Sequence, residues 1–119
     1  PMYMLTLVLE WMEKEGGLPA IYQRNQQKAR LLFDVIDGGD FYKSPVEKTD
    51  RSLMNVVFRI KSGDEALEKK FNAEAEKAGL IGLEGHRSVG GLRASIYNLQ
   101  TLDGVARLAQ FMTDFAKKN

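Results

Sequence analysis

The sequence predicts an α+β domain of two layers, in which a short antiparallel or mixed sheet carries helices packed on one face. Three observations lead to this prediction. The length of 119 residues suits one compact domain. The apolar periodicities follow the order helix, helix, strand, helix, strand, strand, helix. Strands this few and this interrupted do not suit a doubly wound sheet, so we expect the helices on one face only.

The first predicted helix spans residues 3–15 and ends at Gly16 and Gly17. Apolar side chains cover most of its girth, and such a helix expects cover on several sides. A central helix of a self-sufficient bundle is the plain alternative. Because the chain opens on Pro1 with no initiator methionine, we expect a piece of a longer protein.

The second helix begins near Leu18 and Pro19, because proline suits a first turn, and it ends at Gly38 and Gly39. Its inner side is apolar: Ile21, Ala29, Leu32, Phe33 and Ile36. Its polar side is expected to face water: Gln23, Arg24, Gln26, Gln27 and Lys28. The pattern predicts an amphipathic helix.

A polar connection follows this helix. Phe41 and Tyr42 predict a short extended piece, and Pro45 forbids a central strand at its own position. Residues 53–60, LMNVVFRI, are rich in β-branched and aromatic side chains. This segment is therefore predicted to be a buried strand.

The third helix is predicted to start at Ser62 and Glu65, which have the spacing of a capping box. It runs to about Ala78, and Gly79 ends it. Its predicted inner stripe consists of Leu67, Phe71, Ala75 and Ala78. Glu65 and Lys69 form a favourable pair four residues apart, and the charges of this helix are expected to form a solvated face.

Residues 81–87 and 92–97 predict two strands of a hairpin, with Val89, Gly90 and Gly91 in its turn. After a Thr101 cap, the last helix has a helical stripe of apolar residues: Leu102, Val105, Leu108, Ala109, Met112 and Phe115. This helix completes the predicted layer that covers the sheet.

Arg93 is the first candidate for a binding role. Alternation along its strand places Leu92, Ala94 and Ile96 on one face and Arg93, Ser95 and Tyr97 on the other. Arg93 therefore points away from the core. A guanidinium on a rigid strand can grip a carboxylate through two parallel hydrogen bonds. The alternative is an arginine on a solvated sheet face.

His86 and Arg87 end the preceding strand, where the predicted hairpin brings them near Arg93. If the backbone twists at the glycines, both side chains turn toward one anion. A cluster of three such donors matches a ligand that carries both a carboxylate and a phosphate. A hydrogen-bonded turn histidine is the alternative for His86, and a plain turn explains the glycines equally well.

The composition excludes several classes of protein. A net charge of +1 argues against a broad nucleic-acid surface. The absence of cysteine fits a reducing cytoplasm, and a single histidine disfavours a metal site. The apolar start is too short for a membrane anchor, which needs roughly 20 residues. No nucleophile elbow, phosphate loop or Schiff-base lysine context is present, so the residues point to recognition rather than catalysis.

The segment GHRSVGGLRASIYN resembles the C-terminal signature of the phosphoserine aminotransferase family. The likeness extends to RSLMNVVFRI, DEALEKKF, NQQKARLLFDVID and YMLTLVLEWMEKEGG, so it covers essentially the whole chain. Val57 and Leu99 stand where the family usually has proline and alanine. Neither departure touches the candidate anion-binding positions.

This resemblance implies the C-terminal small domain of a fold-type-I aminotransferase. The family is homodimeric, uses pyridoxal phosphate and moves an amino group between glutamate and 3-phosphohydroxypyruvate, which yields phosphoserine in serine biosynthesis. By the same resemblance, Arg93 matches the arginine that holds the substrate carboxylate, and His86 and Arg87 match residues that hold the substrate phosphate.

The resemblance also implies what the chain lacks. In the family, the large domain supplies the Schiff-base lysine and most of the contacts to the cofactor. Residues 1–17 would be the apolar helix that joins this missing large domain to the small domain formed by residues 18–119. We therefore expect no catalytic or cofactor-binding residue here and no transaminase activity from this chain alone, and we expect its apolar first helix to drive self-association. A free-standing module that binds an amino acid or a phosphorylated acid, and a purely structural association domain, are the two alternatives.

Overall fold

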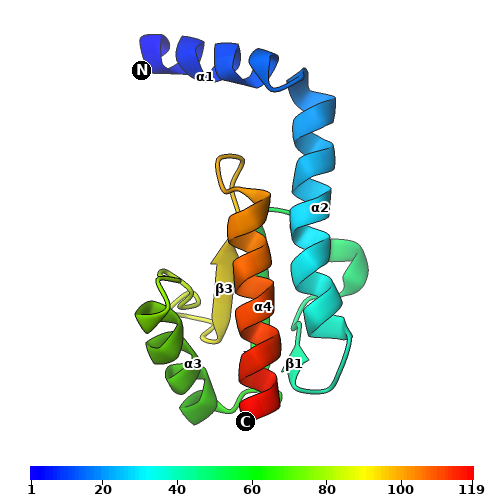
Figure 1. The fold of residues 1–119 in the computed structure, drawn as a ribbon, viewed down its shortest axis with the longest axis vertical. Coiled ribbons are helices and arrows are strands. Elements are labelled where there is room, and N and C mark those ends of the chain that lie inside the picture. The colour runs from blue at the N-terminus through cyan, green and yellow to red at the C-terminus, as the bar shows by residue number, and fades with distance from the viewer.

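The computed structural model describes residues 1–119 and confirms the α+β class (Figure 1). Its elements are α1 (Met2–Lys14), α2 (Gly17–Asp37), β1 (Tyr42–Lys43), a 3-10 turn at Lys48–Asp50, β2 (Asn55–Ile60), α3 (Glu65–Lys77), β3 (Leu92–Ser95) and α4 (Leu102–Lys118). The three strands form one antiparallel sheet in the order β1-β2-β3. Of the two sheet types predicted, the antiparallel one is therefore present.

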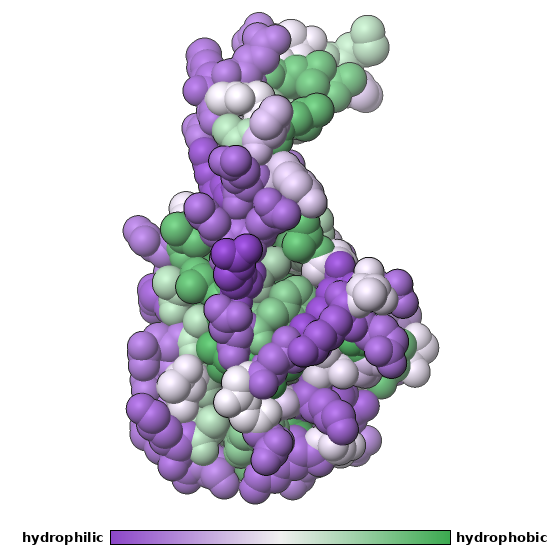
Figure 2. Space-filling model, turned by 90° about the vertical axis from the view of Figure 1, so that its right-hand side faces the viewer, coloured by the Kyte–Doolittle hydropathy of each residue, from purple (hydrophilic) through white to green (hydrophobic).

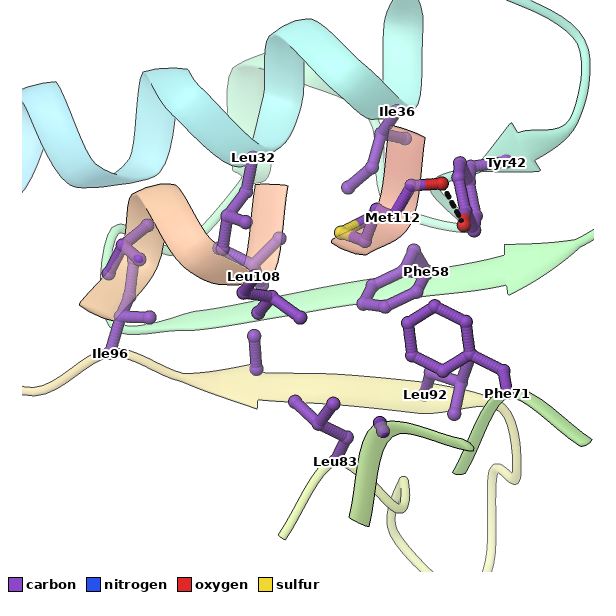
Figure 3. Packing of buried hydrophobic residues seen from close by; sticks show 14 of the residues in the cluster. Leu32, Ile36, Tyr42, Phe58, Phe71, Leu83, Leu92, Ile96, Leu108 and Met112 are labelled. Atoms are coloured by element: carbon purple, nitrogen blue, oxygen red, sulfur yellow. Dashed lines mark hydrogen bonds between the residues drawn. The ribbon is translucent and has the colours of Figure 1, made fainter. Parts of the chain in front are cut away.

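The sheet has one covered face and one open face. Along β2, Val56, Phe58 and Ile60 are fully buried, whereas the alternate residues are only partly buried. The buried side chains of β2 and β3 meet those of α2, α3 and α4 in a single hydrophobic cluster (Figure 3). The open face is therefore the place where polar side chains of the strands are available for binding.

An aromatic cluster joins α3 to the rest of the core. The ring of Phe71 lies 5.8 Å from that of Phe58 and 5.1 Å from that of Phe115, both in edge-to-face geometry. Tyr42 packs beside them and donates its hydroxyl proton to the carbonyl of Met112 at 2.7 Å (Figure 3). Burial raises the pKa of Tyr42, so this donor stays protonated.

Lys28 does not face water, so that prediction is wrong. Its side chain is fully buried, and its amine donates to the carbonyl oxygens of Tyr97 and Gln100 at 2.9 Å and of Ile96 at 3.4 Å. The pKa of Lys28 is lowered, first by burial and then by the nearby charge of Arg24. The lysine fastens α2 to the turn that follows β3.

The predicted capping box at the start of α3 is also wrong. Asp64 caps this helix, because its carboxylate accepts a hydrogen bond from the backbone N–H of Leu67 at 3.2 Å. Ser62 precedes the cap and has a left-handed backbone with φ of +60°. In that conformation the chain is still turning after β2, so the helix begins at Glu65.

Residues 81–87 do not form the predicted strand. A short antiparallel pairing remains, in which Glu84 forms an isolated bridge with Leu92 and backbone hydrogen bonds join Gly85 to Gly91 and Arg93 to Leu83. Gly82 has φ of +77°, which interrupts an extended segment. The true partner of β3 is β2, with Phe58 opposite Leu92 and Asn55 opposite Ser95. The predicted hairpin is therefore present only as this short pairing around the turn, and its first strand does not extend over residues 81–87.

The first helix projects from the upper end of α2, away from the body of the molecule (Figure 1). It contains no buried residue, and seven of its apolar side chains are 46–81% exposed: Met2, Tyr3, Met4, Leu5, Leu7, Val8 and Leu9. Figure 2 shows hydrophobic atoms gathered at this end. The exposed apolar helix expected from the sequence is therefore present, and no helix has both the length and the apolarity to cross a membrane.

Candidate functional site

Strand β3 places Arg93 on the open face of the sheet. Leu92 and Ala94 are buried in the core, at 0% and 1% exposure, and Arg93 lies between them opposite Val57 of β2. On the same face, the hydroxyl of Ser95 donates to Asn55 at 3.1 Å. The alternation expected from the sequence is confirmed.

The guanidinium of Arg93 has no acidic partner in the chain. Its Nε atom is buried and makes no hydrogen bond, and no side-chain hydrogen bond or ion pair involves this residue. The backbone N–H of Arg93 donates to the carbonyl of Leu83 at 2.8 Å, which fixes the strand beneath the side chain. A permanently charged fork with an unused buried donor is suited to receive an anion such as a carboxylate.

Residues 85–91 form a closed loop that carries His86 and Arg87, and we call it the cation loop. The N–H of Gly85 donates to the carbonyl of Gly91 at 3.0 Å, which closes the base of the loop. At its tip, the N–H of Gly90 donates to the carbonyl of His86 at 2.8 Å. The turn holds both cationic side chains at the surface, where a ligand can reach them.

His86 is held in a defined orientation by Ser88. The backbone N–H of Ser88 donates to Nδ1 of His86 at 3.2 Å, and the Ser88 hydroxyl lies 2.8 Å from the same nitrogen. A nitrogen that accepts an N–H cannot itself carry a proton, so the neutral imidazole has its proton on Nε2. His86 therefore presents Nε2–H as a donor without needing a positive charge.

A surface pocket of about 400 Å³ lies against the cation loop, and none of its lining residues is hydrophobic. Its basic lining residues are His86, Arg87, Arg59 and Lys69, and its acidic ones are Glu65, Glu68 and Glu84. The loop thus borders a small polar cavity that carries charges of both signs, with His86 and Arg87 as its basic groups on the loop itself.

The structure brings together only two of the three predicted site residues in that pocket. His86 and Arg87 line it, whereas Arg93 does not. Arg93 lies two residues beyond Gly91, which itself lines the pocket, and it projects from the sheet face that adjoins the loop. The arrangement therefore places the predicted binding residues at two separate positions, one at the loop and one on the strand.

Sequence reasoning missed Arg59 and Glu68, which also line the pocket. Arg59 donates from Nε to one carboxylate oxygen of Glu68 at 2.8 Å and from Nη2 to the other at 3.2 Å. The signal for Arg59 was its place in β2, where period two assigns it to the open face with Val57. The signal for Glu68 was its spacing from Phe71 and Ala75, with which it shares the inner side of α3.

The buried lysine of the chain is not free to bind pyridoxal phosphate covalently. Lys28 is the one buried lysine, and its amine is committed to three backbone carbonyl oxygens. Such an amine has no free position from which to form a Schiff base. No group of three or more acidic or histidine side chains is arranged to hold a metal ion either.

These features match one class of protein. The family described as aminotransferase class-V matches residues 1–108, and the chain belongs to this family. Within it, the chain is 53% identical over 117 residues to the phosphoserine aminotransferase of Acinetobacter baumannii strain ACICU and 54% identical over 117 residues to that of Geobacillus kaustophilus. In both cases the match covers 98% of this chain and 32% of the relative.

Solved structures agree with the sequence relatives. The phosphoserine aminotransferase of Bacillus circulans subsp. alkalophilus superposes with a TM-score of 0.93 at 47% identity, over 98% of this chain and 32% of that chain. The Trichomonas vaginalis enzyme, solved with pyridoxal phosphate bound, gives 0.82 at 34% identity over 87% of this chain and 30% of that chain. The chain therefore spans about a third of the length of the proteins it matches.

Proposed function

We propose that this chain is the substrate-binding part of a phosphoserine aminotransferase, an enzyme that moves an amino group between glutamate and 3-phosphohydroxypyruvate. The observation that carries the proposal is the pair of separate cationic positions in a chain of this family. Arg93 has a buried donor without a partner, and His86 and Arg87 border a polar pocket. The serine-biosynthetic role and a cytoplasmic location follow from this proposal and remain predictions.

The two cationic positions suit the two ends of one phosphorylated amino acid. The planar guanidinium of Arg93 matches the two oxygens of a carboxylate, which both substrates of the reaction carry. Nε2–H of His86 and the guanidinium of Arg87 match phosphate oxygens, which only the phosphorylated substrate carries. This chain would therefore bind and orient the substrate, and its selectivity for the phosphorylated partner would come from the cation loop.

We propose that the reacting amine comes from outside these 119 residues. Because the only buried lysine is committed to carbonyl oxygens, we propose that pyridoxal phosphate, which supplies the electron sink for amino transfer, is held by the part of the relatives that this chain does not span. The chain alone is then inactive. The apolar residues of α1 would pack against that part or against a second subunit.

A chimera tests this proposal. The chain replaces the matching third of the Acinetobacter baumannii enzyme, with which it shares 53% identity over 117 residues. We expect the chimera to aminate 3-phosphohydroxypyruvate with glutamate, and we expect the chain alone to show no transfer. The proposal fails if the chimera folds and binds the cofactor, judged by its absorbance, but does not transfer the amino group. A chain that binds phosphoserine tightly by itself would favour a free-standing binding module.

A further inference from the structure

We propose that Arg59 is a positioning residue that holds the cation loop in place through its ion pair with Glu68. This inference rests on the proposed function for its consequence in catalysis, but its structural core concerns only residues of this chain. Arg59 would act through Gly91 and Gly85 on His86, and not by contact with the ligand.

The first step is the anchor. Arg59 leaves the open face of β2 and forms two hydrogen bonds with the carboxylate of Glu68, at 2.8 and 3.2 Å. The Glu68 side chain is 7% exposed and also accepts the backbone N–H of Ile60 at 3.2 Å. A carboxylate held by three donors from β2 fixes the guanidinium in one orientation. The Arg59 side chain therefore links β2 to α3 in a fixed position.

The second step is the contact between the Arg59 side chain and Gly91 of the cation loop. Gly91 has φ of +75°, and a Cβ atom there would overlap Arg59 Cδ and lie 3.0 Å from Arg59 Nε. The backbone of Gly91 thus rests directly on the aliphatic part of Arg59. Any larger residue at position 91 would push the loop and the arginine apart.

The third step is the hydrogen bond through which the placement of Gly91 determines the placement of His86. The carbonyl of Gly91 accepts the N–H of Gly85, the residue before His86, at 3.0 Å. A Cβ on Gly85 would overlap the carbonyl oxygen of Gly90, so the two ends of the loop are packed against each other. The place of Gly91 on Arg59 therefore sets the place of His86 at the pocket.

The charge of Arg59 argues against a direct role in anion binding. Two of its three guanidinium nitrogens are committed to Glu68, whose negative charge offsets its own. Glu65 and Glu84 line the same pocket and oppose an anion near this pair. A positioning role for Arg59 is therefore distinct from the binding role of His86 and Arg87.

Backbone order in the 119-residue chain tests the structural core of the proposal by nuclear magnetic resonance. The double change Arg59→Met with Glu68→Gln removes the ion pair without leaving a buried carboxylate unpaired. We expect the order parameters of the residue 85–91 amides to fall from near the rigid value of about 0.85 toward about 0.6. Lys69→Met removes a charge from the same pocket and should leave these order parameters unchanged. Arg59→Lys alone, which keeps Glu68 and a positive charge at position 59, should give order parameters well above those of the double variant.

Gly91→Ala provides a second test if the double variant does not fold. Measured against its own background, the added methyl should lower the order of residues 85–91 more when Arg59 is present than in Arg59→Ala, which removes the overlapping side chain. Equal loss of order in both backgrounds, or an ordered loop in the Arg59→Met, Glu68→Gln variant, would overturn the proposal.

The kinetic consequence is measured in the chimera. Because misplacing a binding group by about 1 Å can weaken its effect up to about 100-fold, we expect Arg59→Met with Glu68→Gln to raise the KM for 3-phosphohydroxypyruvate by about tenfold or more. The KM for glutamate and kcat should change less than about twofold. Equal changes in both KM values would contradict positioning of the loop. An inactive unmodified chimera would instead refute the proposed function and leave the order measurements standing.

Discussion

Helices α1 and α4 have similar numbers of apolar residues, but they differ in how many of these residues are buried. α4 buries Val105, Leu108, Met112 and Phe115 against the sheet and α2. α1 buries none, although its first nine positions are almost entirely apolar. The apolar residues of α4 form a stripe along one side, whereas those of α1 surround the helix. α4 therefore contributes to this chain's own core, whereas the apolar surface of α1 is left uncovered by the chain.

The comparison separates α1 from the rest of the chain, residues 17–119, which we call the body. The body should be stable by its own contacts, and α1 should add little to the free energy of unfolding. Substitutions in the body should therefore lower the free energy of unfolding, whereas substitutions in α1 should change association. The following predictions run from the largest expected effect to the smallest.

Phe71→Ala should have the largest effect. The Phe71 ring is fully buried and contacts the aromatic rings of α4 and β2, so its loss removes apolar burial and leaves a cavity. We expect the free energy of unfolding to fall by about 3–5 kcal/mol in urea titrations. Phe71→Leu, which retains most of the volume, should lose clearly less. A fall below about 1 kcal/mol for Phe71→Ala would show that the body is not packed as described.

Lys28→Met should lower the free energy of unfolding by about 2 kcal/mol, because the buried carbonyl oxygen of Ile96 and the partly buried ones of Tyr97 and Gln100 lose their donor. Lys77→Met on the exposed side of α3 is the matched control and should have almost no effect. If both variants are equally stable, the buried ammonium does not fasten α2 to the turn after β3.

The pH dependence of Lys28 has a defined sign. The pKa of Lys28 is lowered by burial, so above that folded value the unfolded chain holds the proton more tightly than the folded one. The free energy of unfolding should therefore rise with pH up to the unfolded pKa of about 10.4. Lys28→Met should lack this rise in alkaline urea titrations, and an identical rise in the variant would refute the assignment.

Asp37→Asn should lower the free energy of unfolding by about 1 kcal/mol at neutral pH. Asp37 accepts two hydrogen bonds from Arg51, at 2.6 and 2.9 Å, and these bonds lower the pKa of its carboxyl group. That contribution is present above the unfolded carboxyl pKa of about 3.9 and is lost as pH falls through the lower folded value. The acid-induced loss of stability should therefore be smaller in Asp37→Asn, and equal losses would contradict the pair.

The double change Leu5→Gln and Leu9→Gln in α1 should have the smallest effect on folding. These side chains are 54% and 51% exposed, so the free energy of unfolding should change by less than about 0.5 kcal/mol. Association of the chain with itself, measured by light scattering, should weaken because the apolar surface is reduced. An unmodified chain that stays monomeric at high concentration and binds no apolar dye would contradict the association.

Much of the fold could be predicted because the apolar pattern was regular. Period two assigned Arg93 to the open face of β3, β-branched and aromatic composition predicted the buried strand that holds Phe58, and helical periodicity found the inner residues of α4. The segment 81–87 failed because its alternation was compatible with a strand, while the left-handed backbone of Gly82 and the pairing of β3 with β2 are decided by the tertiary structure.

The buried charges failed for a different reason. Lys28 lies seven residues after Ile21 and four before Leu32, and Glu68 lies three before Phe71, so spacing placed both on inner sides. Their charge argued for water, and only the structure shows the carbonyl oxygens and the arginine that compensate for burial. The candidate cations were predicted from the sequence, but Arg59 was not, because its role depends on packing against Gly91.

The proposed function requires that Arg93 and the cation loop bind opposite ends of one phosphorylated substrate. Calorimetric titration of the chimera with phosphoserine and with glutamate tests it most directly. We expect Arg87→Ala to weaken phosphoserine alone and Arg93→Ala to weaken both ligands, each by about 1.5–3 kcal/mol, because a charge-assisted contact is lost. Arg30→Ala, at an exposed arginine of α2, should change neither. Unchanged phosphoserine affinity in both Arg87→Ala and Arg93→Ala would contradict the account.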